Sequence, residues 1–210
     1  MSRPGQLATT RMALLQARRR AARVAKGIDL LRTKREALVR RLFELARPAA
    51  EARARSMEQG AEAYAALLSA LAAHGEVELR ALSWPERGVT VSIGEGQIWG
   101  VDVVELAREM SLHRSLVARG TPPASIGPAA LEAARAFEEL AELLIESAAR
   151  ELPVRRIADA VARTTRQVNV LERRVVPSLR AQIASVKRAL DEREREEHLR
   201  LRRVLSRRRP

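Results

Sequence analysis

Apolar residues recur in the first part of the chain at alternating steps of three and four positions. Counted from Leu7, these steps reach Ser56 with few polar interruptions, and Leu or Ile occupies most of the middle of the run. This spacing is that of a coiled-coil seam, whereas a helix on the surface of a globular domain carries a broader apolar stripe. The pattern therefore predicts one long N-terminal helix over 1–56, and its exposed seam requires a second helix against it.

A second long helical pattern occupies residues 129–210 and supplies that partner. Its apolar positions follow the same alternation of three and four residues. Two long helices at the two ends of one chain pair most simply as an antiparallel coiled coil. The predicted seam consists of Leu14, Val24, Ile28, Leu31, Leu38, Leu42, Leu45, Ile157, Val161, Val168, Leu171, Val175, Leu179, Ile183, Val186 and Leu190.

Prolines interrupt both helical patterns. Pro48 and Pro153 lack the backbone N–H that an interior helical residue donates, so we expect the helices to bend or divide there. Around Pro177 the seam takes three successive steps of four residues. Such a stutter predicts a supercoil that is locally straighter.

The residues between the two long helices, 57–128, have a mixed pattern. A helical segment continues to Ala73 and is expected to end at His74–Gly75. Its larger apolar residues are expected on the inward face, namely Met57, Tyr64, Leu67, Leu68 and Leu71.

Alternating residues over 89–103 predict a β-hairpin that turns at Gly94–Gly96. A proline-containing loop follows over 111–128. The predicted fold is all-α, a long antiparallel coiled coil of the N- and C-terminal helices with a middle helical lobe and a small β-hairpin. Its three parts are 1–56, 57–128 and 129–210.

The charge is unevenly distributed along the chain. The net charge is +13 over 210 residues, and almost all basic residues are arginines. Both terminal parts are basic, whereas the middle is acidic. Because aromatic residues make up only 2% of the chain, the core has to be built from Leu, Val, Ile and Ala, which suits a helix–helix seam.

The sequence offers no recognisable catalytic or cofactor chemistry. The absence of cysteine excludes disulfides and thiolate metal sites, and His74, His113 and His198 stand apart, with no second ligand at helical spacing. No phosphate-binding glycine loop ending in Lys and Ser or Thr is found. These features predict a non-catalytic protein without a cofactor, a metal or a directly bound nucleotide. Since no apolar run approaches the ~20 residues of a membrane span, we expect a peripheral, cytoplasmic chain.

Several longer motifs carry a resemblance to a known family. They are TRMALL at 10–15, AKGIDLLRTKREAL at 25–38, TRQVNVLE at 165–172 followed by Pro177, and LDEREREEHLRLRR at 190–203. Together they resemble the D subunit of the V-type and archaeal-type rotary ATPases, and Ile98-Trp99-Gly100 is similar to the hairpin of that family. Gln167 stands where the family usually has Arg, and 75–128 match poorly outside the hairpin.

The resemblance implies a central rotor shaft that transmits torque. The end bearing both termini would enter the ring of catalytic and non-catalytic subunits (the A and B subunits), and the small F subunit would bind the side of the shaft. The other end would dock on the funnel-shaped C subunit (d in eukaryotes) above the membrane rotor. One copy would serve each complex at the cytoplasmic face of the membrane, coupling ATP synthesis or hydrolysis to transport of H⁺ or Na⁺.

A shaft that turns against similar sites requires weak contacts at its bearing end. Exposed ion pairs contribute only about 0–1 kcal/mol each, so arginines on long stems suit such a surface. The residues predicted to meet acidic loops of the head are Arg11, Arg18, Arg19, Arg20, Arg200, Arg202 and Arg203.

Other classes of protein share some of these features. A basic coiled coil could bind nucleic acid through its arginines, or it could act as a scaffold. Against nucleic-acid binding, aromatic residues such as Phe43, Tyr64 and Trp99 lie outside the arginine clusters, where bases would stack. The narrow seam is also unlike the broad apolar face of a helix on a membrane surface.

Overall fold

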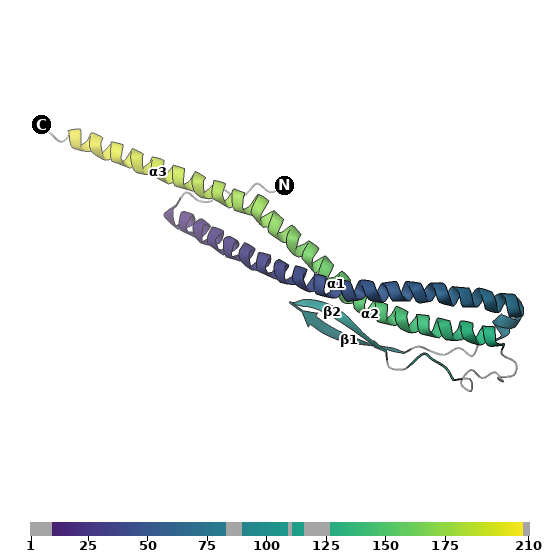
Figure 1. Cartoon of the computed structure of the whole chain (residues 1–210). Helices are drawn as coiled ribbons and strands as arrows, with labels where there is room; N and C mark the ends of the chain where they lie inside the picture. Colours follow the sequence, from purple (N-terminus) through teal and green to yellow (C-terminus); the bar gives the residue numbers. More distant parts are fainter. Residues whose placement is uncertain (1–9, 83–89, 109–110, 116–126, 208–210) are drawn as a thin grey trace. The chain divides into compact units, whose positions relative to one another are not determined.

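The computed structural model describes residues 10–82, 90–108, 111–115 and 127–207 (Figure 1). Its elements are α1 (Arg11–Leu82), β1 (Val91–Ile98), β2 (Val101–Arg108), α2 (Pro128–Val170), a π-helical turn η3 (Leu171–Val175) and α3 (Val176–Arg207). The prediction of an all-α fold with one small antiparallel hairpin is confirmed. The expected helix start at Leu7 lies outside the described residues.

The chain forms two compact units. Unit 1 combines residues 1–36 with 162–210, and unit 2 contains residues 37–161. Helix α1 contributes its first part to unit 1 and the rest to unit 2, and α2 is divided in the same way. The three-part division at 57 and 129 stays a prediction.

In unit 1 the start of α1 is paired antiparallel with α3 and the end of α2. Arg11 contacts Glu194 at 2.7 Å, and further along α1 Arg32 contacts Glu172 at 2.6 Å. The position on one helix rises as that on the other falls, which defines the antiparallel direction. At the start of α1, Thr10 accepts a hydrogen bond from the Ala13 amide at 3.1 Å, so Thr10 caps the helix as its residue type favours.

In unit 2 the rest of α1 is paired antiparallel with α2. Arg53 approaches Glu151 at 3.7 Å, Arg55 approaches Glu146 at 3.2 Å and Gln59 donates to Glu139 at 3.4 Å. The core of this unit brings Leu38 of α1 and Ile157 of α2, both with 0% exposure, together with Val101 of the hairpin. The hairpin thus covers the helix pair where the largest buried side chains meet.

The residues of the predicted seam are all buried or half-buried. They share the interior with many alanines that were not predicted as core residues, including Ala13 and Ala17 in unit 1 and Ala49, Ala52, Ala63, Ala70, Ala133 and Ala160 in unit 2. A methyl group at these positions lets the two helix backbones approach closely. The interior therefore depends as much on small residues as on Leu and Ile.

The predicted inward face of the middle part of α1 is wrong at three positions. Met57, Tyr64 and Leu68 are 68%, 60% and 52% exposed, and only Leu67 and Leu71 of that set are half-buried. The buried row instead consists of Ala52, Ser56, Ala63 and Ala70. This row continues the heptad spacing of the N-terminal seam, and that continuity determines the inward face more strongly than residue size does.

The turn of the hairpin also differs from the prediction. Gly94 and Gly96 lie within β1, opposite Glu105 and Val103, and the chain reverses at Trp99–Gly100 between Ile98 and Val101. Both turn residues have positive φ, 52° for Trp99 and 70° for Gly100, as a two-residue type I′ turn requires. Gly96 is needed for space, because a Cβ there would lie 2.9 Å from the Glu105 carboxylate.

Trp99→Asn is expected to stabilise the hairpin by about 1 kcal/mol, because a left-handed backbone is costly for Trp and well tolerated by Asn. Hydrogen exchange of the β1 and β2 amides should slow accordingly. Gly100→Ala is the matched control and should accelerate exchange, since its φ of 70° favours glycine. Unchanged or faster exchange in Trp99→Asn would contradict the strain assigned to Trp99.

The helix breaks are placed differently from the prolines. Helix α1 continues through Pro48 and α2 through Pro153, and the non-helical residue inside α1 is Gly75 (φ 75°, ψ 164°). The expected end at His74–Gly75 is therefore a break within α1, after which the helix resumes to Leu82. No described helix is divided at Pro48 or Pro153.

The stutter around Pro177 coincides with a change in helix type. The Val176 amide donates to the carbonyl of Leu171, which is the five-residue bond of a π-helix. Pro177 has no N–H to offer the carbonyl one turn earlier, so the regular ladder is interrupted at this point. The extra residue in the turn accounts for the successive steps of four between Leu171 and Ile183.

Candidate functional site

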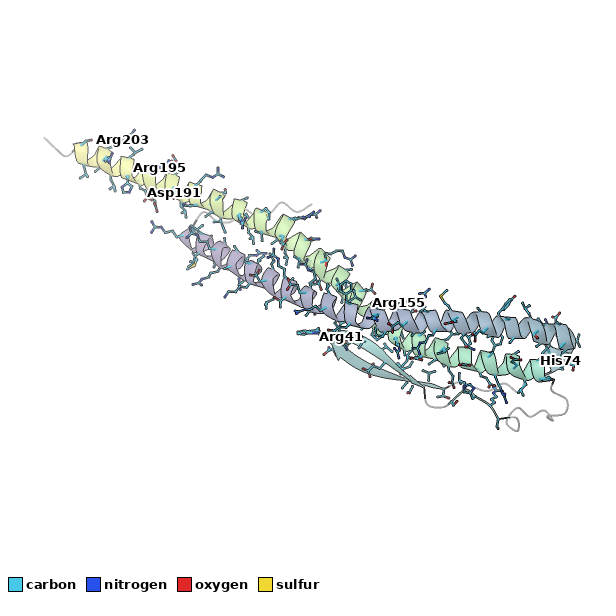
Figure 2. The ribbon with its side chains drawn as sticks, viewed as in Figure 1. Arg41, His74, Arg155, Asp191, Arg195 and Arg203 are labelled. Atoms are coloured by element: carbon cyan, nitrogen blue, oxygen red, sulfur yellow. The ribbon has the colours of Figure 1, made fainter. Side chains whose placement is uncertain are left out.

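The predicted arginine surface lies entirely in unit 1. Arg11, Arg18, Arg19 and Arg20 are exposed on the first turns of α1, and Arg200, Arg202 and Arg203 are exposed near the end of α3. Figure 2 shows Arg203 and Arg195 along those last turns of α3. Exposure on both helices keeps the guanidinium groups available to a partner.

A groove between α1 and α3 gathers part of this surface. It has a volume of about 700 Å³ and is lined by Arg19, Arg20 and Arg23 together with Gln16, Gln182 and Leu179. Its floor is apolar and its rim is cationic, which favours an acidic segment with an apolar side chain. Arg23 was not among the predicted contacts, although it belongs to the same basic run of the sequence.

The structure does not bring the two arginine groups into one patch. Because α3 pairs antiparallel with α1, Gln182 lies beside Arg19 and Arg20, whereas Arg200 follows eighteen residues later. At a rise of 1.5 Å per residue this separates the groups by about 27 Å along α3. The predicted contacts form a series along the helix pair, so different arginines would face different parts of a surrounding partner.

The arginines near the end of α3 are interspersed with carboxylates. Glu194 holds Arg11, Glu192 lies 3.5 Å from Arg195 and Glu196 lies 3.9 Å from Arg200. The side chains in these contacts are half or more exposed, so each contact stabilises the fold little. Among the described residues, Arg202 and Arg203 are the cations of this segment that have no carboxylate within ion-pair distance.

The sequence reasoning missed an apolar component of the same segment. Leu199, Leu201, Val204 and Leu205 are all more than half exposed, beyond the seam residue Leu190. The signal was available, since these apolar residues continue after the last seam position paired with α1. This end of α3 therefore offers both arginines and uncovered apolar side chains.

The described residues hold no group of three or more His, Asp or Glu side chains suited to binding a metal ion. No helix among them is long and apolar enough to cross a membrane. What the described surface does offer is a series of cationic and apolar positions on a pair of antiparallel helices. The class of protein that these features define is a helical coiled-coil subunit that works through contacts with other chains.

Comparison with known proteins identifies the family. The family described as the D subunit of ATP synthase matches residues 13–206. The D subunit of the V-type ATP synthase of Anaeromyxobacter dehalogenans is 41% identical over 95% of this chain and 96% of its own length. That of Thermus thermophilus is 42% identical over 95% and 87%, and the D subunit of the A-type ATP synthase of Methanopyrus kandleri is 36% identical over 93% and 84%. The chain belongs to the D-subunit family of the V-type and A-type ATP synthases.

Proposed function

We propose that this chain is the central rotor shaft of a V/A-type ATP synthase, without catalytic activity of its own. The observation that carries the proposal is the match to the D-subunit family along nearly the whole chain, combined with antiparallel helix pairing in both units. It would sit at the cytoplasmic face of the membrane as one copy per complex. Its proposed partners are the A and B subunits of the head, the small F subunit and the C subunit.

A shaft must resist sliding of one helix along the other while it transmits torque. In unit 1 the Arg11–Glu194 and Arg32–Glu172 contacts fix the register at two levels, and Ile28, Val168 and Leu179 are buried between them. Interlocked side chains of such a seam oppose slippage because moving by one residue would expose every buried position. Unit 1 therefore has the internal stiffness that the proposed role requires.

The bearing surface must instead be weakly held. The proposed bearing arginines are exposed, and contacts of exposed ions contribute about 0–1 kcal/mol each. Because the arginines are spread along the helix pair, the contacts can be exchanged one after another as the shaft turns. This supports Arg11, Arg18, Arg19, Arg20, Arg200, Arg202 and Arg203 as contacts with acidic loops of the head.

Reversal of Arg18, Arg19 and Arg20 to Glu is expected to lower the ratio of ion transport to ATP hydrolysis several-fold at low ionic strength, because acidic loops would now be repelled. Both rates should be measured on the purified complex in vesicles. The matched control reverses Arg40, Arg135 and Arg156, which are exposed in unit 2 outside the proposed bearing. Equal coupling in the two triple variants would remove the bearing role.

The proposed function itself is tested by purification of the tagged chain from native membranes, with identification of its partners at low and moderate salt. Recovery of the catalytic and non-catalytic head subunits with a small stalk protein at both salt concentrations is the expected result. Recovery of nucleic acid alone, lost as salt rises, would replace the shaft with a basic nucleic-acid-binding coiled coil.

A further inference from the structure

Helix α1 carries a second apolar row on the side opposite its buried one. Within unit 2, the exposed residues Ala54, Met57, Ala61, Tyr64, Leu68 and Ala72 follow one another at steps of three or four. The buried Ala52, Ser56, Ala63 and Ala70 occupy the other side of the same turns. A row with this spacing has the form of a coiled-coil seam. We name Ala54–Ala72 at these positions the outer seam.

The outer seam is uncovered in the part of the chain that the structure describes. Met57, Tyr64 and Leu68 are each more than half exposed, although a Met, Tyr or Leu gains stability when it is buried. Large residues alternate with alanines along the row, so it presents ridges separated by shallow holes. This relief accepts the side chains of another helix, because knobs of one helix fit into holes of the other.

One flank of the outer seam is acidic. Glu58 and Glu62 lie along it, exposed and one helical turn apart, and the contacts among the described residues include no cation for either of them. Glu51 continues the flank and is held by Arg47 at 2.9 Å. Like charges one turn apart repel each other and destabilise a helix. In a chain with a net charge of +13, this local acidity is an exception that a partner's cations would offset.

We infer that the outer seam binds an amphipathic helix of a different protein chain, with apolar residues at heptad spacing and a row of Lys or Arg along one flank. The apolar residues of that helix insert at Ala54, Ala61 and Ala72, between the larger side chains. Its basic row faces Glu58 and Glu62. The opposite side of α1 remains paired with α2, so binding requires no rearrangement of unit 2.

The test places a photo-crosslinking amino acid at Ala61 of the full chain in its native cells, with sequencing of the crosslinked peptide. The expected product joins position 61 to one peptide of another chain, with apolar residues at steps of three and four and several Lys or Arg residues. The matched control places the same amino acid at Ala148, an exposed alanine on α2 of the same unit. That position should not yield this product.

The charge of the flank is tested in the same cells. Adding Glu58→Lys and Glu62→Lys should lower the yield of the position-61 product about five-fold or more, since two attractive contacts become repulsive. Glu132→Lys, at an exposed glutamate of α2, should leave the yield unchanged. No product from position 61, a product with a second copy of this chain, an acidic peptide, or insensitivity to the two Lys substitutions would each overturn the inference.

Discussion

Leu38→Ala and Ile157→Ala should each lower the free energy of unfolding of unit 2 by about 2–5 kcal/mol. Both side chains have 0% exposure and meet in the cluster that includes Val101 and Ala160. Truncation removes buried methyl groups and leaves a cavity, and the interlocked helices limit how far the surroundings collapse into it. The measurement is urea unfolding of the isolated chain, followed by helical circular dichroism.

The matched control for these variants is Phe43→Ala. Phe43 lies on the same helix and has a larger side chain, but it is 73% exposed. Its removal should change the unfolding free energy by no more than about 0.5 kcal/mol. A cost at Phe43 equal to that at Leu38 would mean that the assigned core of unit 2 is wrong.

Val168→Asp should lower the free energy of unfolding at neutral pH by an amount on the order of 3–5 kcal/mol, because the variant buries a charge without a partner. Val168 is 2% exposed in unit 1, close to the π-helical turn. The structure would therefore favour the neutral acid and raise the pKa of the new carboxyl above its value in the unfolded chain.

The sign of the pH dependence follows from that direction. A group that binds its proton more tightly in the folded chain favours folding as the pH falls, so the Val168→Asp defect should shrink on acidification and grow as the pH rises through the raised pKa. Val168→Asn is the matched control, because it introduces a polar group of similar shape that does not titrate. Unfolding of both variants across pH 4–8, relative to the parent chain, is the measurement. Parallel pH profiles would show that position 168 is not desolvated.

The pairing of the long helices could be predicted from the sequence because the heptad pattern is strong at both ends of the chain. The seam spacing identified α1 and α3 as partners, and the same pattern contained the stutter where η3 is found. The positions of Leu38 and Ile157 in the seam were predicted from this spacing alone. In long, strongly periodic segments the period itself is the dominant information.

The middle of α1 could not be predicted in the same way because it carries two apolar rows. Residue size favoured Met57, Tyr64 and Leu68 as inward residues, whereas the helix buries Ala63 and Ala70. Small apolar residues gain less from burial individually but allow a closer approach of the backbones, and a sequence pattern does not weigh these two effects. The outer seam was therefore assigned to the core.

The hairpin turn illustrates a different limit. Glycine at 94 and 96 indicates a turn by its conformational freedom, but here its value is the missing side chain, which leaves room for Glu105. Trp99 adopts a backbone conformation that its residue type disfavours. The predicted bearing arginines met a third limit, since a set of exposed cations contains no information on their spacing along an antiparallel pair.

The alanine-rich interior gives this chain an unusual relation between side-chain size and freedom to vary. In most proteins the bulkiest apolar residues are the ones that substitution disturbs most, whereas here some of the largest, such as Met57 and Tyr64, face outward. Positions such as Ala63 and Ala70, with 0% exposure, have no room for even a few added atoms. Sequence drift in the isolated fold is therefore restricted where the side chains are smallest, and changes at the large outward residues are restricted only by whatever binds them.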